Sequence, residues 1–119
     1  MKIAVTAQGK GLDSKVDPRF GRAAYILVID LSDDNVRVID NAENVNAFKG
    51  AGIQAAVSVS DSGAEVLLTG YCGPNAFKTL DAAGVKVAND VSGTVGEAVE
   101  AFKSGQVAFS EEANVDGHW

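Results

Sequence analysis

Short apolar runs alternate with polar, glycine-containing stretches along the chain, and they predict five strands. The apolar runs are mostly rich in β-branched residues, which is typical of strands, and they cover residues 2–7, 25–30, 36–40, 64–69 and 85–88. The turn residues Ser32-Asp33-Asp34-Asn35 predict that the second and third of these strands form a hairpin.

A first helix is expected after Gly50-Ala51-Gly52, because small residues there lead into a helical spacing that ends at Ser62-Gly63. The valines of this segment also permit a strand. The side chains that share the predicted helical face are Ile53, Ala56, Val57 and Ser60.

Two further helices are indicated by their caps. The second runs from Asn75 to Ala83, with Phe77 and Leu80 facing inward and Gly84 at its end. The last helix follows a capping box formed by Thr94 and Glu97, and its apolar spacing is that of an amphipathic helix. The apolar positions of this helix are Val95, Ala98, Val99 and Phe102.

These elements predict an α/β layered domain. If strands one, three, four and five run parallel and strand two runs opposite, the loops at residues 8–22, 41–52, 70–74 and 89–94 lie at one edge of the sheet. Ligands of open α/β sheets bind beyond the carboxyl ends of the parallel strands. We therefore look for function at that edge.

With 119 residues and 46% hydrophobic content, the chain suits one domain with its own core. We assign residues 1–105 to this domain and expect residues 106–119 to form a loosely held tail. The sequence has no apolar run of about 18 residues, and its start reads as a strand rather than as a signal peptide. We expect no membrane partner and a soluble, reducing, cytoplasmic setting.

The net charge of −6 argues against nucleic acids and anionic membranes as partners, because both are bound through clustered positive charge. The long loop after the first strand is a local exception. Residues 7–23 carry four basic and two acidic side chains, and the basic ones are Lys10, Lys15, Arg19 and Arg22. Such a loop could focus a small anion, although a simple solvated loop explains the same charges.

The turn from Thr69 to Phe77 leads from a strand into a helix. Gly73-Pro74 opens that helix, and Pro fits at its first position because the missing N–H has no partner there. The next amides point outward and suit an anion. Lys49 and the helix start at residues 91–94 are expected at the same edge, and together they predict an anion cradle.

Other chemistry is less well supported by the residue pattern. Cys72 could be a soft-metal ligand or a nucleophile, but a small, partly buried turn residue is the simpler interpretation. Its only histidine partner, His118, lies in the tail. A metal-dependent nuclease or phosphoryl-transfer enzyme would need aspartates such as Asp13, Asp17, Asp30 and Asp40, but no pair of them has a spacing that specifies a two-metal site. No phosphate-binding GxxxxGK[ST] or GxGxxG motif is present.

Three motifs in order resemble the dinitrogenase iron–molybdenum cofactor biosynthesis family, and the resemblance covers roughly residues 1–105. The motifs are Val16-Asp17-Pro18-Arg19-Phe20-Gly21-Arg22-Ala23, Gly50-Ala51-Gly52-Ile53 and Thr69-Gly70-Tyr71-Cys72-Gly73-Pro74-Asn75-Ala76-Phe77. The resemblance implies a three-layer, ribonuclease-H-like α/β fold with a five-stranded mixed sheet and no nuclease activity. Within the family, the chain looks most like members that carry a molybdenum–copper sulfide cluster.

The resemblance implies that the partner is an anionic metal–sulfur cluster bound by a non-enzymatic carrier or scaffold. A cluster that brings its own sulfides needs few cysteine ligands, and its charge suits arginine, lysine and backbone amides. Lys49 stands where many relatives have histidine, which favours charge pairing over imidazole ligation. The alternative is a protein–protein interaction module without a cluster. The expected site residues are Arg19, Phe20, Gly21, Arg22, Lys49, Gly50, Gly52, Gly70, Cys72, Gly73 and Pro74.

Overall fold

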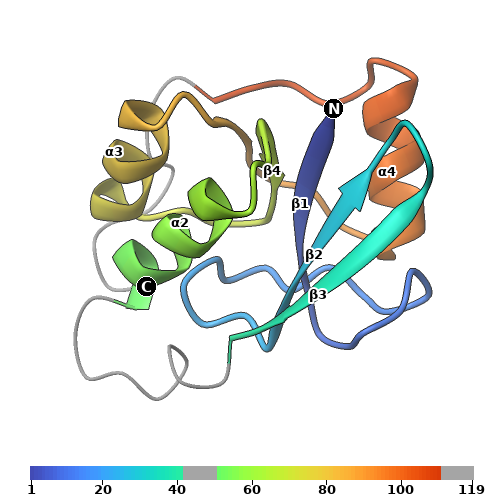
Figure 1. The fold of residues 1–119 in the computed structure, drawn as a ribbon, viewed down its shortest axis with the longest axis horizontal. Coiled ribbons are helices and arrows are strands. Elements are labelled where there is room, and N and C mark those ends of the chain that lie inside the picture. Colours follow the sequence, from blue (N-terminus) through green and yellow to red (C-terminus); the bar gives the residue numbers. More distant parts are fainter. Residues whose placement is uncertain (42–50, 111–119) are drawn as a thin grey trace.

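The computed structural model describes residues 1–41 and 51–110 of the chain. In these ranges the strands are β1 (Lys2–Ala7), β2 (Tyr25–Asp30), β3 (Asn35–Asp40), β4 (Val66–Leu68) and β5 (Lys86–Ala88). The helices are α2 (Ala51–Asp61), α3 (Pro74–Ala82) and α4 (Val95–Lys103). The helix alternative is therefore confirmed for the segment after Gly52, and every strand predicted from the sequence is present (Figure 1).

The strands form one mixed sheet with the order β3-β2-β1-β4-β5. β1 pairs in parallel with β4, and β4 pairs in parallel with β5. β2 is antiparallel to both of its neighbours, so β3 runs in the same direction as β1. The predicted strand directions are confirmed, and the carboxyl ends of four strands point to one edge.

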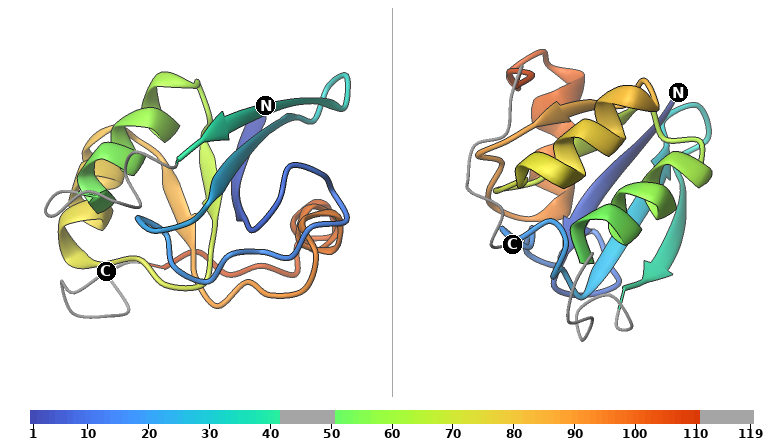
Figure 2. Two further views of the ribbon diagram at one scale, coloured as in Figure 1. Left: turned by 90° about the horizontal axis from the view of Figure 1, so that it is seen from below. Right: turned by 90° about the vertical axis from the view of Figure 1, so that its left-hand side faces the viewer.

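The sheet is the middle layer of three. Figure 2 shows α2 and α3 on one face and α4 on the other. One core cluster lies under α2 and α3 and includes Ile26, Val59, Leu67 and Leu80. A second cluster lies under α4 and includes Val5, Leu27, Leu68 and Val95. Five successive residues of β1 are buried, because the central strand is covered on both faces.

The helix starts follow the predicted capping chemistry. Pro74 is the first residue of α3, and Gly73 is its N-cap. At α4, Thr94 Oγ1 accepts from the amide of Glu97 at 3.1 Å, and the Glu97 carboxylate accepts from the amide of Thr94 at 3.0 Å. This is the capping box that the sequence predicts. Leu80 is fully buried as expected, and Phe77 is partly buried against the same cluster.

The predicted inner face of α2 is right for Ala56, which is buried, but wrong for Ile53 and Val57. Ile53 and Val57 are 42% and 45% exposed. The helix instead turns its small residues to the core, so that Gly52 at its first turn can approach the backbone of Gly21 closely. The buried residues of α2 are Ala51, Ala55, Ala56 and Val59.

The expectation of a loose tail is wrong for its first part. The amide of Ser110 donates to the carbonyl of Val87 on β5 at 2.7 Å. The Asn89 side-chain amide donates to Ser110 Oγ at 2.9 Å. Residues up to Ser110 are therefore attached to the outer strand of the sheet, whereas the rest of the predicted tail lies outside the described residues. Within those residues, no helix is long and apolar enough to cross a membrane.

Candidate functional site

The loops that follow β1, β4 and β5 are joined by backbone hydrogen bonds at the carboxyl edge of the sheet. The amide of Val16 donates to the carbonyl of Gly93, and the amide of Asp17 donates to that of Thr6, both at 2.9 Å. The amide of Asp90 donates to the carbonyl of Gly70 at 2.9 Å. The predicted meeting of loops 8–22, 70–74 and 89–94 is therefore confirmed.

The basic loop and the turn after β4 form a short parallel ladder. The amide of Tyr71 donates to the carbonyl of Pro18 at 2.6 Å, and the amide of Phe20 donates to that of Tyr71 at 3.1 Å. Arg19 and Tyr71 face each other across this ladder. Two of the three motifs found in the sequence are thereby held side by side.

Close backbone approach explains two of the glycines in the motifs, Gly21 and Gly70. A Cβ on Gly21 would lie 2.7 Å from Cα and N of Gly52, and one on Gly70 would lie 2.7 Å from Cα and O of Pro18. Real Cβ atoms do not come so near to backbone atoms, so only glycine fits these positions without a shift. These glycines bring the walls of the site together. Their predicted contact with a ligand stays a prediction.

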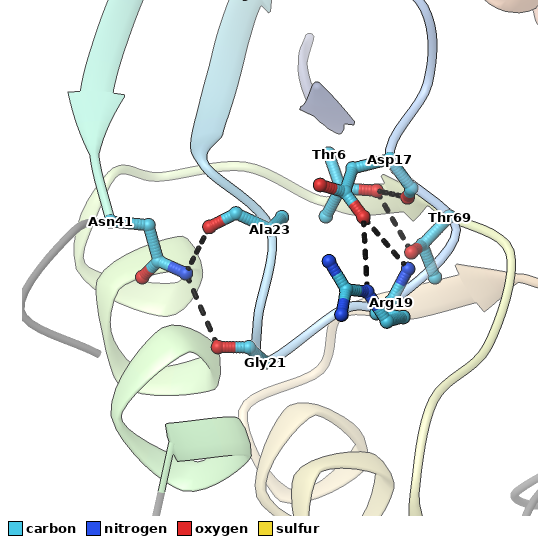
Figure 3. A network of polar contacts seen from close by, with 7 residues as sticks. All are labelled: Thr6, Asp17, Arg19, Gly21, Ala23, Asn41 and Thr69. Atoms are coloured by element: carbon cyan, nitrogen blue, oxygen red, sulfur yellow. Dashed lines mark hydrogen bonds and ion pairs between the residues drawn. The ribbon is translucent and has the colours of Figure 1, made fainter. Parts of the chain in front are cut away.

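A buried polar network links β1, β4 and the basic loop (Figure 3). Thr6 Oγ1 donates to the carbonyl of Asp17 at 2.7 Å, and it lies 2.9 Å from Thr69 Oγ1. Because a threonine hydroxyl has one hydrogen, Thr69 must be the donor in the second bond. Thr6 and Thr69 are fully buried. The network therefore fixes the root of the basic loop against the two central parallel strands.

Asp17 is buried and holds the backbone of Arg19 in place. Asp17 is 4% exposed, and its Oδ1 accepts from the backbone amide of Arg19 at 3.1 Å. The same oxygen lies 3.9 Å from Nε of Arg19. Asp17 thus orients the guanidinium at its Nε atom, while the Arg19 side chain stays 48% exposed to solvent. Among the described residues, no group of His, Cys, Asp and Glu is placed to hold a metal ion.

Asn41 holds the turn that carries Arg22. Its side-chain amide donates to the carbonyl of Ala23 at 2.8 Å and to that of Gly21 at 3.3 Å (Figure 3). These two carbonyls lie on either side of Arg22 in the chain. Asn41 is only 1% exposed and directly follows β3. Its side chain therefore joins the end of β3 to the turn that carries Arg22.

The starts of α3 and α4 differ in the availability of their amides. No side chain caps the first turn of α3, which begins with Gly73 and Pro74. Such a helix start is suited to an anion. The similar role predicted for residues 91–94 is wrong, because the first amides of α4 already donate within the protein. Their acceptors are Ser14 O for Val95, Leu12 O for Gly96 and Thr94 Oγ1 for Glu97.

Cys72 packs in the core cluster beneath α2 and α3 and is fully buried. Burial raises the pKa of its thiol to about 12. The thiol therefore stays protonated near neutral pH and does not reach the surface of the site. Direct ligation by Cys72 has no support in this geometry, and its backbone is the part that shapes the turn.

The remaining predicted residues divide into two groups. Phe20 is buried in the same cluster as Cys72, whereas Arg22, Gly52 and Pro74 are partly buried at the carboxyl edge. The predicted site residues Lys49 and Gly50, together with His118, lie outside the described residues. The sequence interpretation missed the positioning residues Thr6, Asn41 and Thr69, although a polar residue at the end of an apolar strand is a signal by which Thr6 and Thr69 could have been found.

Comparison with known proteins shows the family. The family model described as dinitrogenase iron-molybdenum cofactor matches residues 1–105. The apo form of the orange protein from Desulfovibrio gigas is 50% identical, with 96% of each chain covered and a TM-score of 0.93. A putative NifB protein from Thermotoga is 37% identical, with 98% of each chain covered and a TM-score of 0.84.

A putative dinitrogenase from Methanocaldococcus jannaschii shares the fold at 14% identity, with coverages of 94% and 96% and a TM-score of 0.71. No curated protein matches the chain. The likeness to the orange protein and to the cofactor family supports the binding or carrying of a cofactor in general. The family match spans the sheet, its helices and all three motifs, and the chain therefore belongs to the dinitrogenase iron–molybdenum cofactor family.

Proposed function

We propose that this protein binds and carries an anionic molybdenum–copper sulfide cluster at the carboxyl edge of its sheet. The observation that carries the proposal is the half-exposed guanidinium of Arg19 beside a helix start that no side chain caps. Arg19 is paired with Tyr71, shortly before Gly73 and Pro74 open α3. A fixed cation and outward amides at one place are the features that bind an anion.

The chemistry of the site favours a cluster that arrives with its own ligands. The described residues supply no cluster of metal-ligating side chains at this edge. The one cysteine is buried and protonated, so it offers no thiolate. The protein then contributes charge and hydrogen bonds to the cluster's sulfides. Arg22 and Lys49 are proposed to add to the charge supplied by Arg19.

We propose a carrier or scaffold rather than an enzyme, working in the cytoplasm. Asp17, the acid two residues before Arg19, is buried and accepts from the Arg19 amide, so it is poorly placed to act as a general acid or base. The competing hypothesis is a protein–protein interaction module that binds no cluster. The two hypotheses differ in whether charge at the carboxyl edge is needed for the protein's binding activity.

Reconstitution with tetrathiomolybdate and copper tests the proposal. The wild-type protein should retain molybdenum and a visible absorption band after desalting, and Arg22→Glu should retain much less. Arg37→Glu is the matched control, because Arg37 makes the same charge change in β3 beside Lys2 and Asp30, away from the carboxyl ends. If wild-type protein retains no molybdenum, or both variants lose it equally, the proposal is wrong.

A further inference from the structure

Asp17 places a fixed negative charge beside Arg19 (Figure 3). The amide of Asp17 donates to the carbonyl of Thr6 at 2.9 Å, and its carbonyl accepts from Thr6 Oγ1 at 2.7 Å. The backbone of Asp17 is thus tied to β1 at two points. Because Asp17 is also only 4% exposed, its carboxylate is held where the loop places it.

The carboxylate lies closer to the backbone of Arg19 than to its guanidinium. Asp17 Oδ1 accepts from the Arg19 amide at 3.1 Å, whereas it lies 3.9 Å from Nε, beyond hydrogen-bonding distance. The two terminal nitrogens of the guanidinium lie beyond Nε, on a side chain that is 48% exposed. These nitrogens carry the donors with which Arg19 can bind an anion.

The charge of Asp17 is not needed to hold this turn. The bond from a side-chain oxygen to the amide two residues later is also made by asparagine and, more weakly, by serine. A buried carboxylate has a larger desolvation cost than either of these neutral side chains. The negative charge at position 17 is therefore expected to act on what Arg19 binds.

A carboxylate fixed behind the guanidinium has two opposite effects on a bound anion. It orients Arg19, which favours binding, and it repels the anion, which opposes binding. The orienting contact is weak, because the 3.9 Å separation at Nε leaves the side chain half exposed. Repulsion between like unit charges about 7 Å apart, at effective dielectric constants of about 40–80, raises a dissociation constant about three- to tenfold. Repulsion should therefore outweigh orientation.

We propose that Asp17 limits the affinity of the Arg19 site for anions and so allows a bound cluster to be released, a regulatory role that rests on the proposed function. A carrier needs a site that both takes up and gives up its cargo. Among variants of one binding site, most differences in affinity lie in the dissociation rate. Asp17 thus sets how long the loaded protein keeps its anion.

Titration with tetrathiomolybdate, followed by absorption, tests this role. Asp17→Asn should bind the anion about three- to tenfold more tightly than the wild-type protein at low salt, and stopped-flow dilution should show slower release. Asp17→Ser also removes the charge and should have the same effect. Added salt should narrow the difference from wild type, because it screens the charge.

Asp13→Asn is the matched control, because it makes the same charge change in the same loop. Asp13 is exposed, and no ion pair between it and Arg19 is found among the described residues. Its substitution should leave the affinity for tetrathiomolybdate nearly unchanged. If Asp13→Asn tightens binding as much as Asp17→Asn does, net charge explains the gain and the role of Asp17 is overturned.

Arg19→Gln separates this inference from the proposed function. If Arg19→Gln weakens tetrathiomolybdate binding while Asp17→Asn leaves the affinity unchanged or lowers it, Asp17 only orients Arg19. The inference is then overturned, and the anion site stands. If Arg19→Gln binds as tightly as wild type, the anion site itself is wrong and the inference falls with it. Circular dichroism gives the folded fraction of each variant, so that affinities are compared per folded protein.

Discussion

Gly21 of the basic loop and Gly52 of α2 lie in direct backbone contact, with 2.7 Å between a Cβ built on Gly21 and the Cα of Gly52. The contact joins two motifs that are far apart in the sequence. It also explains why α2 presents alanines to the core, because larger residues would hold the helix away from the loop. The arrangement of the site thus depends on the absence of a side chain.

Gly21→Ala should destabilise the fold by about 1–3 kcal/mol, the usual cost of forcing an extra methyl group into a packed region. Urea unfolding followed by circular dichroism measures the change. Gly11→Ala is the matched control in the same loop, because a Cβ there meets only the Asp13 carboxylate, which can turn away. Equal effects of the two substitutions would show that the Gly21 contact is not tight.

Because Thr69 donates to Thr6, removing the hydroxyl of Thr6 and removing that of Thr69 should lower the free energy of unfolding by different amounts. Thr69→Val removes a donor while Thr6 still donates to Asp17, so the loss should be about 0.5–1.5 kcal/mol. Thr6→Val leaves the buried Thr69 hydroxyl without its acceptor and should cost about 1–3 kcal/mol. Urea unfolding of both variants gives the comparison. A larger loss for Thr69→Val would reverse the assigned donor.

The sheet could be predicted from sequence because its strands are continuous apolar runs separated by turn residues. The strand directions followed from the connections, since two helical crossovers require parallel strands, whereas the strand order comes from the structure. The inner face of α2 could not be predicted, because Ile53 and Val57 are more hydrophobic than the alanines that are buried in their place. Which residues of α2 are buried depends on its contact with Gly21, which is distant in the sequence.

In the candidate site too, some features could be predicted from the sequence and others could not. The start of α3, which no side chain caps and which is proposed to bind an anion, could be predicted from Gly73-Pro74, a local signal. The loss of that role at α4 could not, because Val95 and Gly96 donate to carbonyls of the first loop. Asn41 opens a polar, irregular stretch of the sequence, and only the fold places its amide between the carbonyls on either side of Arg22.

Asn41→Asp should destabilise the protein in a pH-dependent way. A carboxylate would face the carbonyls of Gly21 and Ala23 in a buried position, so desolvation and repulsion should raise its pKa in the folded state. A raised pKa makes the folded state prefer the protonated acid. The penalty should therefore grow as pH rises from about 4 towards 7, and urea unfolding at several pH values measures it. Asn41→Ala serves as the control, and an equal pH dependence in both variants would contradict the prediction.

The thiol of Cys72 should behave as a core residue in reactivity, stability and cluster binding alike. Because burial raises its pKa to about 12 from an ordinary value of 9.0, the folded protein should not react with a disulfide reagent at pH 8, and urea should expose the thiol to rapid reaction. The raised pKa also means that the folded state favours the protonated thiol, so its contribution to stability is complete below about pH 9 and is lost as pH rises towards 12.

Cys72→Ala should then lower stability without lowering the molybdenum retained per folded protein, whereas Arg22→Glu should lower retention without this change in stability. Loss of molybdenum from a folded Cys72→Ala variant would instead identify the thiol as a ligand and require the turn after β4 to open.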